Sequence, residues 1–244
     1  MRNTPAGKKS KKWTAFFILL LILCMLQSAL LMILYVKAAT PQRLLAKLGF
    51  HCSEETDWTL ESWNSSLKQL KYDSDIVFIG DSLTRGENFQ AYFPEKKIVN
   101  LGLSGDSLSG ISRRAIIIRE LSPEQIFIEG GVNSLDSSNV EDLSVLYESM
   151  IVDIIADNPE ASVFIQSILP ISNAVQKGRM TNEKIINLNH KLQEIAMRQG
   201  ITYVDIYSLY VLNGEMNPEY TKDGIHLKDE YKHLWLEALS EFIE

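Results

Sequence analysis

The sequence predicts an α/β fold, in which a mainly parallel, doubly wound sheet follows one N-terminal transmembrane helix. After residue 74, short β-rich runs alternate with helical patterns, which is typical of βαβ units and of a parallel sheet. Before it, residues 14–36 form an uncharged, apolar stretch long enough to cross a bilayer. With 244 residues and 45% hydrophobic content, the chain has the length for one substantial core plus an appendage.

The apolar stretch, TAFFILLLILCMLQSALLMILYV, is interpreted as an uncleaved membrane anchor. The alternative is a cleaved signal peptide, since Ala38-Ala39 offers a small-residue cleavage site. However, the stretch is longer than the ~7–15 residues of a signal's apolar region. Lipoprotein processing is not expected, because Leu23 stands before Cys24 where a small residue is needed.

The charges around the anchor predict its orientation. Residues 1–13 carry five bases and no acid, so the positive-inside rule makes this tail cytoplasmic and the rest extracellular. Those five bases leave 19 of the 24 Lys and Arg against all 31 Asp and Glu in residues 37–244, a formal charge of −12. This balance argues against nucleic acid as a partner.

Residues 37–73 are predicted to be a linker containing an amphipathic helix. Its apolar residues recur at spacings of three and four: Trp58, Leu60, Trp63, Leu67 and Leu70. The two tryptophans would also suit a membrane interface, but Glu54, Glu55 and Asp57 favour packing against the domain. The only cysteines are Cys24 and Cys52, so no disulfide within the exported domain is expected.

Strands are predicted near 75–80, 97–101, 125–129, 162–168 and 202–206, and helices near 85–92, 109–120, 140–157, 182–198 and 229–243. The fourth helix places Ile185, Ile186, Leu188, Leu192 and Ile195 largely on one face, with Gly200 as its stop signal. The last helix has Trp235, Ala238, Leu239 and Phe242 in a similar pattern.

Ser82 follows the first strand, at the edge of the sheet where ligands bind in open α/β folds. A serine needs an adjacent base to become a nucleophile. His226 is the candidate, because Asp223 stands three residues before it and is able to orient its imidazole. His51, His190 and His233 are interpreted as surface or packing residues.

Acyl transfer also needs donors for the negative oxygen of the tetrahedral intermediate. The candidates are the backbone N–H of Ser82, the backbone N–H of Gly105 and the side-chain amide of Asn133. Each follows a predicted strand, so all three are expected to converge.

These blocks resemble those of the SGNH hydrolases, the GDSL esterase and lipase family, over about residues 74–243. Gly80-Asp81-Ser82-Leu83, residues 100–106, Gly131-Val132-Asn133 and Asp223-x-x-His226 appear in the family's order. The resemblance implies Ser82, His226 and Asp223 as a triad, and Ser82, Gly105 and Asn133 as the oxyanion hole. It also implies a three-layer α/β/α sandwich with a flavodoxin-like, five-stranded sheet over residues 74–244.

The chain departs from the family pattern at a few positions. Ser134 stands where an acidic or amide residue is frequent, and Lys228 stands where a hydroxyl residue is frequent. Glu230-Tyr231 replaces a later glycine-tyrosine pair. We expect Asp229 to cap the last helix instead.

The expected function is an extracytoplasmic serine esterase that cleaves small-acyl esters of glycans or lipids without cofactor or metal. One alternative is an O-acyltransferase acting on cell-wall sugars. Another is a non-catalytic binding module of the same fold. The acyl chain length and the oligomeric state are left open by the sequence.

Overall fold

The computed structural model describes residues 73–175 and 180–243, which all belong to one compact unit, Leu48–Glu244. The predicted anchor at 14–36 and the predicted amphipathic helix at 58–70 lie outside these described residues, as do the boundaries proposed for them. Within the two described ranges, no helix has the length and apolarity needed to cross a membrane.

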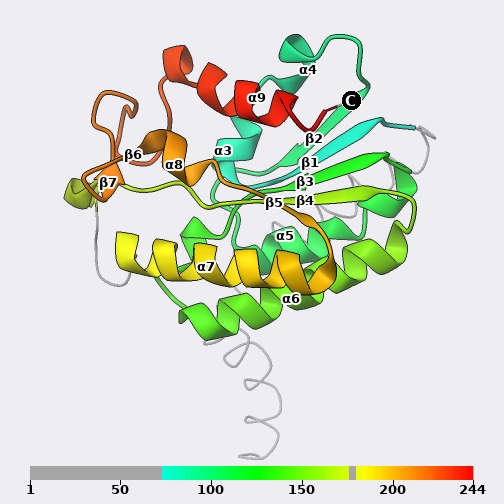
Figure 1. Cartoon of the computed structure of the whole chain (residues 1–244), viewed down its shortest axis with the longest axis horizontal. Helices are drawn as coiled ribbons and strands as arrows, with labels where there is room; N and C mark the ends of the chain where they lie inside the picture. Colours follow the sequence, from blue (N-terminus) through cyan, green and yellow to red (C-terminus); the bar gives the residue numbers. More distant parts are fainter. Residues whose placement is uncertain (1–72, 176–179, 244) are drawn as a thin grey trace, which may run out of the picture. The chain divides into compact units, whose positions relative to one another are not determined.

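The central element is a parallel, five-stranded sheet (Figure 1). Its strands are β1 (Ile76–Gly80), β2 (Ile98–Gly102), β3 (Gln125–Ile128), β4 (Ser162–Gln166) and β5 (Thr202–Val204). They lie in the order β2-β1-β3-β4-β5, with all four pairings parallel. This is the flavodoxin-like order, so the prediction of a five-stranded, doubly wound parallel sheet is confirmed. The strand order reverses between β1 and β3, the place where such sheets bind ligands.

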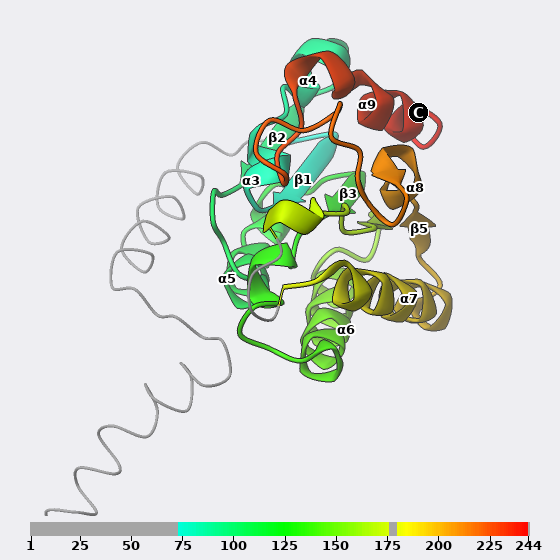
Figure 2. The same ribbon diagram turned by 90° about the vertical axis from the view of Figure 1, so that its left-hand side faces the viewer.

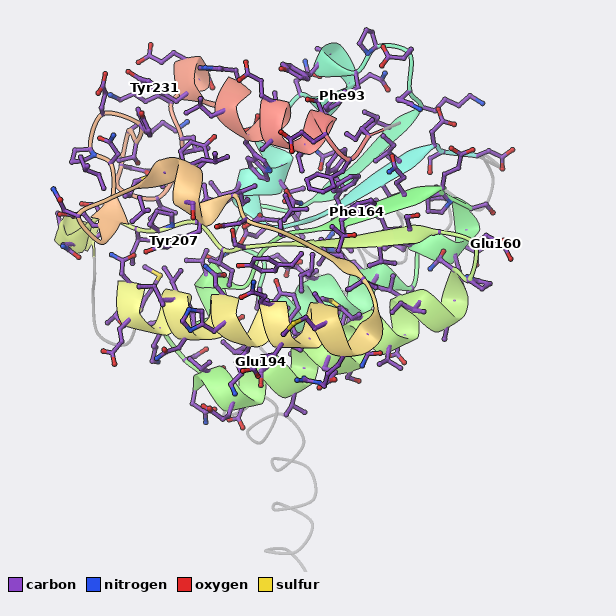
Figure 3. All side chains as sticks on the ribbon, in the orientation of Figure 1. Phe93, Glu160, Phe164, Glu194, Tyr207 and Tyr231 are labelled. Carbon is purple, nitrogen blue, oxygen red and sulfur yellow. The ribbon has the colours of Figure 1, made fainter. Side chains whose placement is uncertain are left out.

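The strands alternate their side chains between two cores. On β1, Val77 and Ile79 belong to one cluster, whereas Ile76 and Phe78 belong to the other. Phe78, Phe127 and Phe164 lie side by side across three strands, with ring centroids 5.0 and 4.4 Å apart. Phe164 lies in the core on the α9 side of the sheet (Figure 3). Both faces of the sheet are therefore covered, which explains the continuous apolar runs in the sequence.

Helices cover the two faces separately, which gives three layers. One face packs against α5 (Leu108–Ala115), α6 (Val140–Asp157) and α7 (Asn182–Gln199). The other packs against α3 (Ser82–Arg85), α4 (Phe89–Tyr92), α8 (Tyr207–Tyr210) and α9 (His233–Ser240), as Figures 1 and 2 show from two sides.

The predicted end of the fourth helix is confirmed. Gly200 is the C-cap of α7 with a φ of +67°, a left-handed conformation that glycine adopts without steric cost. Thr181 caps the other end by accepting from the Lys184 N–H. Four residues of the predicted apolar face of α7 are buried, Ile185, Leu188, Leu192 and Ile195, whereas Ile186 is half-buried. Asn182, Asn189 and Ala196 are buried as well, although they were not predicted to be. The exposed Glu194 lies on the outer side (Figure 3).

Two predicted helices are divided in the structure. The helix expected at 85–92 is two short helices, α3 and α4, because Asp81 starts a helix at Ser82 and Asn88 caps a new one. The helix expected at 109–120 ends at Ala115 and is followed by a 3-10 turn, η1 (Ile118–Glu120).

The C-terminal region also differs from the prediction. The helix expected at 229–243 is a 3-10 turn, η4 (Asp229–Tyr231), followed by α9. The expected capping role of Asp229 is wrong, since neither element has a side-chain cap and the carboxylate lies 3.0 Å from Lys232 Nζ. A two-stranded hairpin, β6 (Val211–Leu212) with β7 (Glu215–Met216), and α8 were not predicted.

Candidate active site

The loop after β1 carries Ser82 in a tight turn. Gly80 ends β1, and a Cβ at this position would lie 2.1 Å from Thr84 Oγ1 and 2.3 Å from the Glu129 carbonyl oxygen. Only glycine therefore fits. Asp81 accepts a 3.0 Å hydrogen bond from the Leu83 N–H at Oδ1, which makes Ser82 the first residue of α3. The sequence thus places a serine hydroxyl at the N-terminus of a short helix.

Ser82, His226 and Asp223 form one hydrogen-bonded chain. Ser82 Oγ lies 2.9 Å from His226 Nε2, and His226 Nδ1 lies 2.7 Å from Asp223 Oδ2. The carboxylate accepts from the protonated Nδ1, so Nε2 is left free to accept the serine proton. The structure brings these three predicted residues together across 144 positions of sequence.

The loop before α9 orients the imidazole through its backbone. Asp223 Oδ1 accepts from the N–H groups of Ile225 at 3.0 Å and His226 at 2.7 Å. Partial burial raises the pKa of Asp223, but these two N–H groups and the His226 side chain outweigh it and hold the pKa below its ordinary value. Asp223 is therefore an anion at neutral pH.

Gly224 in this loop is required by its conformation and its neighbours. Its φ is +92°, and a Cβ would lie 2.8 Å from Val175 Cγ1 and 3.0 Å from the Cβ of Ser172. The Gly224 carbonyl also accepts a 2.8 Å hydrogen bond from the Ser172 N–H. The loop that carries His226 is thus fixed to the segment after β4.

The three predicted oxyanion donors follow the ends of β1, β2 and β3. Within residues 73–175 and 180–243, the backbone N–H groups of Ser82 and Gly105 have no hydrogen-bond acceptor. Gly105 has a φ of +73°, and a Cβ there would meet no atom within 4 Å. Asn133 is exposed, and its Nδ2 donates to the Asp106 carbonyl at 3.0 Å, which leaves its second N–H available. All three groups thus stand at the carboxyl ends of neighbouring strands, on either side of the switch point between β1 and β3.

Ser134 stands where the family frequently has an acidic or amide residue, and here its hydroxyl makes a structural contact. Its Oγ accepts a 2.8 Å hydrogen bond from the N–H of Leu108, the first residue of α5. The 3-10 turn η2 (Val132–Ser134) is thereby attached to the loop that holds Gly105.

Sequence reasoning missed the buried Arg114 on α5. Its Nη2 donates to Asp106 Oδ2 at 2.6 Å and to the Gly80 carbonyl at 3.0 Å, and its Nη1 donates to the Leu101 carbonyl. One guanidinium therefore links the ends of β1 and β2 to the residue after Gly105. The basic pair Arg113-Arg114 was the only signal, and the sequence does not say which of the two points inward.

Sequence reasoning also missed Glu129, which follows β3 directly and is fully buried. Its Oε2 accepts a 3.0 Å hydrogen bond from Thr84 Oγ1. Burial raises the pKa of Glu129 well above its ordinary value, and the charge of Asp81 raises it further. Burial likewise raises the pKa of Asp81, to about 6.

Most of the described chain matches one known protein family. Residues 78–232 match the model of the family described as "GDSL-like Lipase/Acylhydrolase family". The chain belongs to this family. It is a carboxylic ester hydrolase. A search of curated proteins found no significant match.

Solved structures with the same fold resemble this hydrolase. A protein of Streptococcus pneumoniae, provisionally assigned as a platelet activating factor, is 24% identical with a TM-score of 0.64, covering 79% of this chain and 100% of its own. A GDSL-like lipase of Bacteroides thetaiotaomicron is 22% identical with a TM-score of 0.65, covering 75% and 96%. A variant of Axe2, an acetyl-xylooligosaccharide esterase of a Geobacillus species, is 17% identical with a TM-score of 0.57, covering 70% and 94%. At these identities the likeness establishes the shared fold.

The other two described histidines of the hydrolase do not take part in these contacts. His190 is exposed on α7, and His233 Nδ1 lies 2.8 Å from the Glu230 carbonyl. His51 lies outside the described residues. Within the described part of the chain, no cluster of three or more His, Cys, Asp or Glu side chains suits a metal ion. The expectation of a reaction without metal or cofactor stays a prediction.

Proposed function

We propose that this hydrolase is an extracytoplasmic serine esterase that cleaves small-acyl, acetyl-type esters of glycans or lipids. Ser82 is the nucleophile, His226 the general base and Asp223 its orienting partner. The backbone N–H groups of Ser82 and Gly105 and the amide of Asn133 form the oxyanion hole.

The hydrogen-bonded chain of Ser82, His226 and Asp223 is the main support for this proposal. The contacts of 2.9 Å from Ser82 Oγ to His226 Nε2 and 2.7 Å from His226 Nδ1 to Asp223 Oδ2 have the order and lengths that nucleophilic catalysis requires. They occur beside the switch point of the sheet, where the N–H groups of Ser82 and Gly105 have no acceptor among the described residues.

The reaction proceeds in two steps. Ser82 Oγ attacks the ester carbonyl while its proton passes to His226 Nε2, and the imidazolium then protonates the departing alcohol. A water molecule then gives a proton to His226 Nε2 and attacks the acyl-serine carbonyl. The bond from the acyl carbon to Ser82 Oγ breaks, the imidazolium returns its proton to Oγ, and the acid is released. In both steps the negative oxygen accepts from the oxyanion donors, each worth roughly 3–4 kcal/mol of barrier.

Exposure of the triad favours water over a sugar as the acyl acceptor. The side chains of His226 and Asp223 are 36% and 49% exposed. A transferase that uses a sugar acceptor must keep water away from the acyl-enzyme. An open triad does not do so, which supports hydrolysis rather than O-acyl transfer.

The substrate class is supported by the fold neighbours. One is named an acetyl-xylooligosaccharide esterase and another a GDSL-like lipase, so the same architecture serves glycan and lipid esters.

We also propose that the hydrolase is anchored in the membrane by its N-terminal segment. Residues 14–36 are the anchor, residues 1–13 the cytoplasmic tail and residues 37–73 the linker to a hydrolase domain at 74–244. The positive charges before the apolar stretch support this topology.

Activity is tested with the full chain in detergent against p-nitrophenyl esters of increasing chain length. We expect highest kcat/KM with acetate, and loss of at least roughly 10³-fold for Ser82→Ala. Ser240→Ala, which removes an exposed hydroxyl from α9, is the matched control and should retain activity. Equal turnover by wild type and Ser82→Ala would refute the triad.

Topology is tested on intact cells with a membrane-impermeant maleimide. In the variant Cys24→Ala the remaining thiol is Cys52. Labelling without cell lysis is expected, whereas labelling only after lysis would contradict an extracellular domain.

A further inference from the structure

Two buried carboxyl groups lie under the turn that carries Ser82, and the proposed triad does not use either. Asp81 and Glu129 are both 0% exposed. Each has one bonded oxygen, since Asp81 Oδ1 accepts from the Leu83 N–H and Glu129 Oε2 accepts from Thr84 Oγ1. The other oxygens, Asp81 Oδ2 and Glu129 Oε1, are buried without a hydrogen-bond partner among the described residues.

Among the described residues, no lysine or arginine forms an ion pair with either carboxylate. Arg114 on α5 is paired with Asp106, which adds negative charge near Asp81. Tyr147 on α6 donates to the Gly130 carbonyl, and burial together with the charges of Glu129 and Asp81 raises its pKa well above its ordinary value. The N–H of Gly131 faces Asp81 and lowers its pKa, but forms no bond of ordinary geometry with Oδ2.

His226 is the remaining group that acts on the pair. Its positive form lowers the pKa of Asp81, whereas Asp81 and Thr84 are the groups that act on Glu129. Two buried like charges that repel one another do not both ionise. The proton therefore resides on Glu129, on which no positive group acts, and the charge resides on Asp81, which interacts with His226.

We propose that Glu129 is a positioning residue for the catalytic serine: a neutral carboxylic acid that holds Thr84 and leaves a single negative charge, on Asp81, under the nucleophile turn. Glu129 is well placed for this. Thr84 stands two residues after Ser82 in α3, and Asn133 stands four residues after Glu129, so the Thr84–Glu129 hydrogen bond joins the segment of the nucleophile to that of an oxyanion donor. The proposal rests on the proposed triad.

The neutral state has a consequence for catalysis. The tetrahedral intermediate places a negative oxygen between Ser82, Gly105 and Asn133. A second buried anion at Glu129 would repel that oxygen, and the low dielectric of the core would strengthen the repulsion. The single charge on Asp81 instead supports the imidazolium that His226 becomes. Ionisation of Glu129 is therefore expected to reduce kcat at alkaline pH.

Infrared spectroscopy of the full chain in detergent tests the neutral state without any assay of activity. The expected result is a carbonyl band of a protonated carboxylic acid that persists at pH 8 in wild type and is lost in Glu129→Gln. Absence of such a band in wild type, or its persistence in Glu129→Gln, would overturn the proposal even if the esterase activity is confirmed.

The kinetic test compares two substitutions over pH 6–10. Glu129→Ala leaves the Thr84 hydroxyl without an acceptor, and a roughly tenfold loss of kcat with little change in KM is expected. Glu129→Gln supplies a neutral acceptor, so most of the kcat lost in Glu129→Ala should be recovered. Its kcat should also not fall at alkaline pH. A residue that only fills space would not alter the pH profile. If Gln recovers no more activity than Ala, or keeps the alkaline decline, the proposal is wrong.

Discussion

Arg114 and Asp106 form a buried ion pair directly behind the oxyanion loop, with Nη2 and Oδ2 2.6 Å apart. The side chains are 10% and 7% exposed, so both charges are largely shielded from water. The same guanidinium donates to the Gly80 carbonyl, and the Asp106 carbonyl accepts from Asn133. The ion pair thus connects the strand before Ser82 with two of the proposed oxyanion donors.

Loss of this arginine is expected to affect both stability and catalysis. Arg114→Met leaves the Asp106 carboxylate buried without a partner, which costs roughly 3–5 kcal/mol of unfolding free energy. We also expect a lower kcat, because Asn133 loses its anchored acceptor. Urea unfolding and steady-state kinetics measure the two effects.

A double variant separates the ion pair from a general packing effect. Arg114→Met with Asp106→Asn removes both charges, so its destabilisation should be clearly smaller than the sum of the single variants. Arg119→Met is the control, because Arg119 is 44% exposed in a surface pair with Glu120 and its removal should cost at most about 1 kcal/mol. If the losses of unfolding free energy were additive in the double variant, Arg114 and Asp106 would not be coupled.

Asp223 is expected to act through the orientation of His226. Asp223→Asn preserves the shape but offers an amide in place of the anion, so Nδ1 loses its charged acceptor and the useful tautomer is no longer favoured. We expect kcat to fall by roughly 10³–10⁴-fold with ester substrates. Asp229→Asn, an exposed carboxylate paired with Lys232, is the matched control and should be close to wild type. A loss of less than tenfold in Asp223→Asn would argue against the assigned role.

The pKa of Asp223 also predicts how stability responds to acid. Its pKa in the folded state is below the ordinary value of 3.8. The contribution to stability is therefore fully present above that value and is lost as the pH falls through the folded pKa. Asp223→Asn should lose this dependence, so wild type and variant should converge in unfolding free energy only in strong acid.

The raised pKa of Glu129 predicts a pH dependence of the unfolding free energy that is opposite to that of Asp223. Its folded pKa is raised well above 4.5, so the folded state keeps a proton that the unfolded state releases. Wild-type stability should then decrease as the pH rises from about 4.5 towards the folded pKa, by up to about 1.4 kcal/mol per pH unit. Glu129→Gln lacks this dependence, so its unfolding free energy relative to that of wild type should increase with pH. A constant difference in unfolding free energy between pH 5 and 8 would show that Glu129 ionises normally.

The sequence was sufficient for the sheet and for the residues of the candidate triad. Strand β1 is apolar on both faces and ends at Gly80, and this pattern alone locates Ser82 at a strand end. Gly200 likewise indicates the end of α7. Because carboxyl ends of parallel strands meet at one edge, residues far apart in the chain are expected to meet there.

The buried charges could not be predicted in the same way. Glu129 stands at the polar end of the third predicted strand, and Arg114 has the spacing of an ordinary helix residue. Whether such a side chain points to solvent or inward depends on partners from other elements: Thr84 for Glu129, and Asp106 with two carbonyls for Arg114. The break between α3 and α4 also depends on local capping by Asp81 and Asn88 rather than on apolar periodicity.

Gly105 gives the sharpest test of the oxyanion hole, because Gly214 is a close structural match. Both have a left-handed backbone, with φ of +73° and +81°, and a Cβ on either would meet no atom within 4 Å. Gly214 lies in the turn between β6 and β7 and is not a candidate site residue. Alanine at either position should therefore cost a similar strain of roughly 1–2 kcal/mol.

Only Gly105→Ala is expected to reduce activity. Its methyl group and any relaxation of φ alter the position of the Gly105 N–H, so kcat should fall by roughly 10²-fold while KM changes little. Thermal unfolding of both variants, followed by kinetics at a temperature where both are folded, separates the two effects. Equal kcat in Gly105→Ala and Gly214→Ala would exclude Gly105 as an oxyanion donor, whereas a loss confined to Gly105→Ala assigns the effect to the site because the backbone strain is matched.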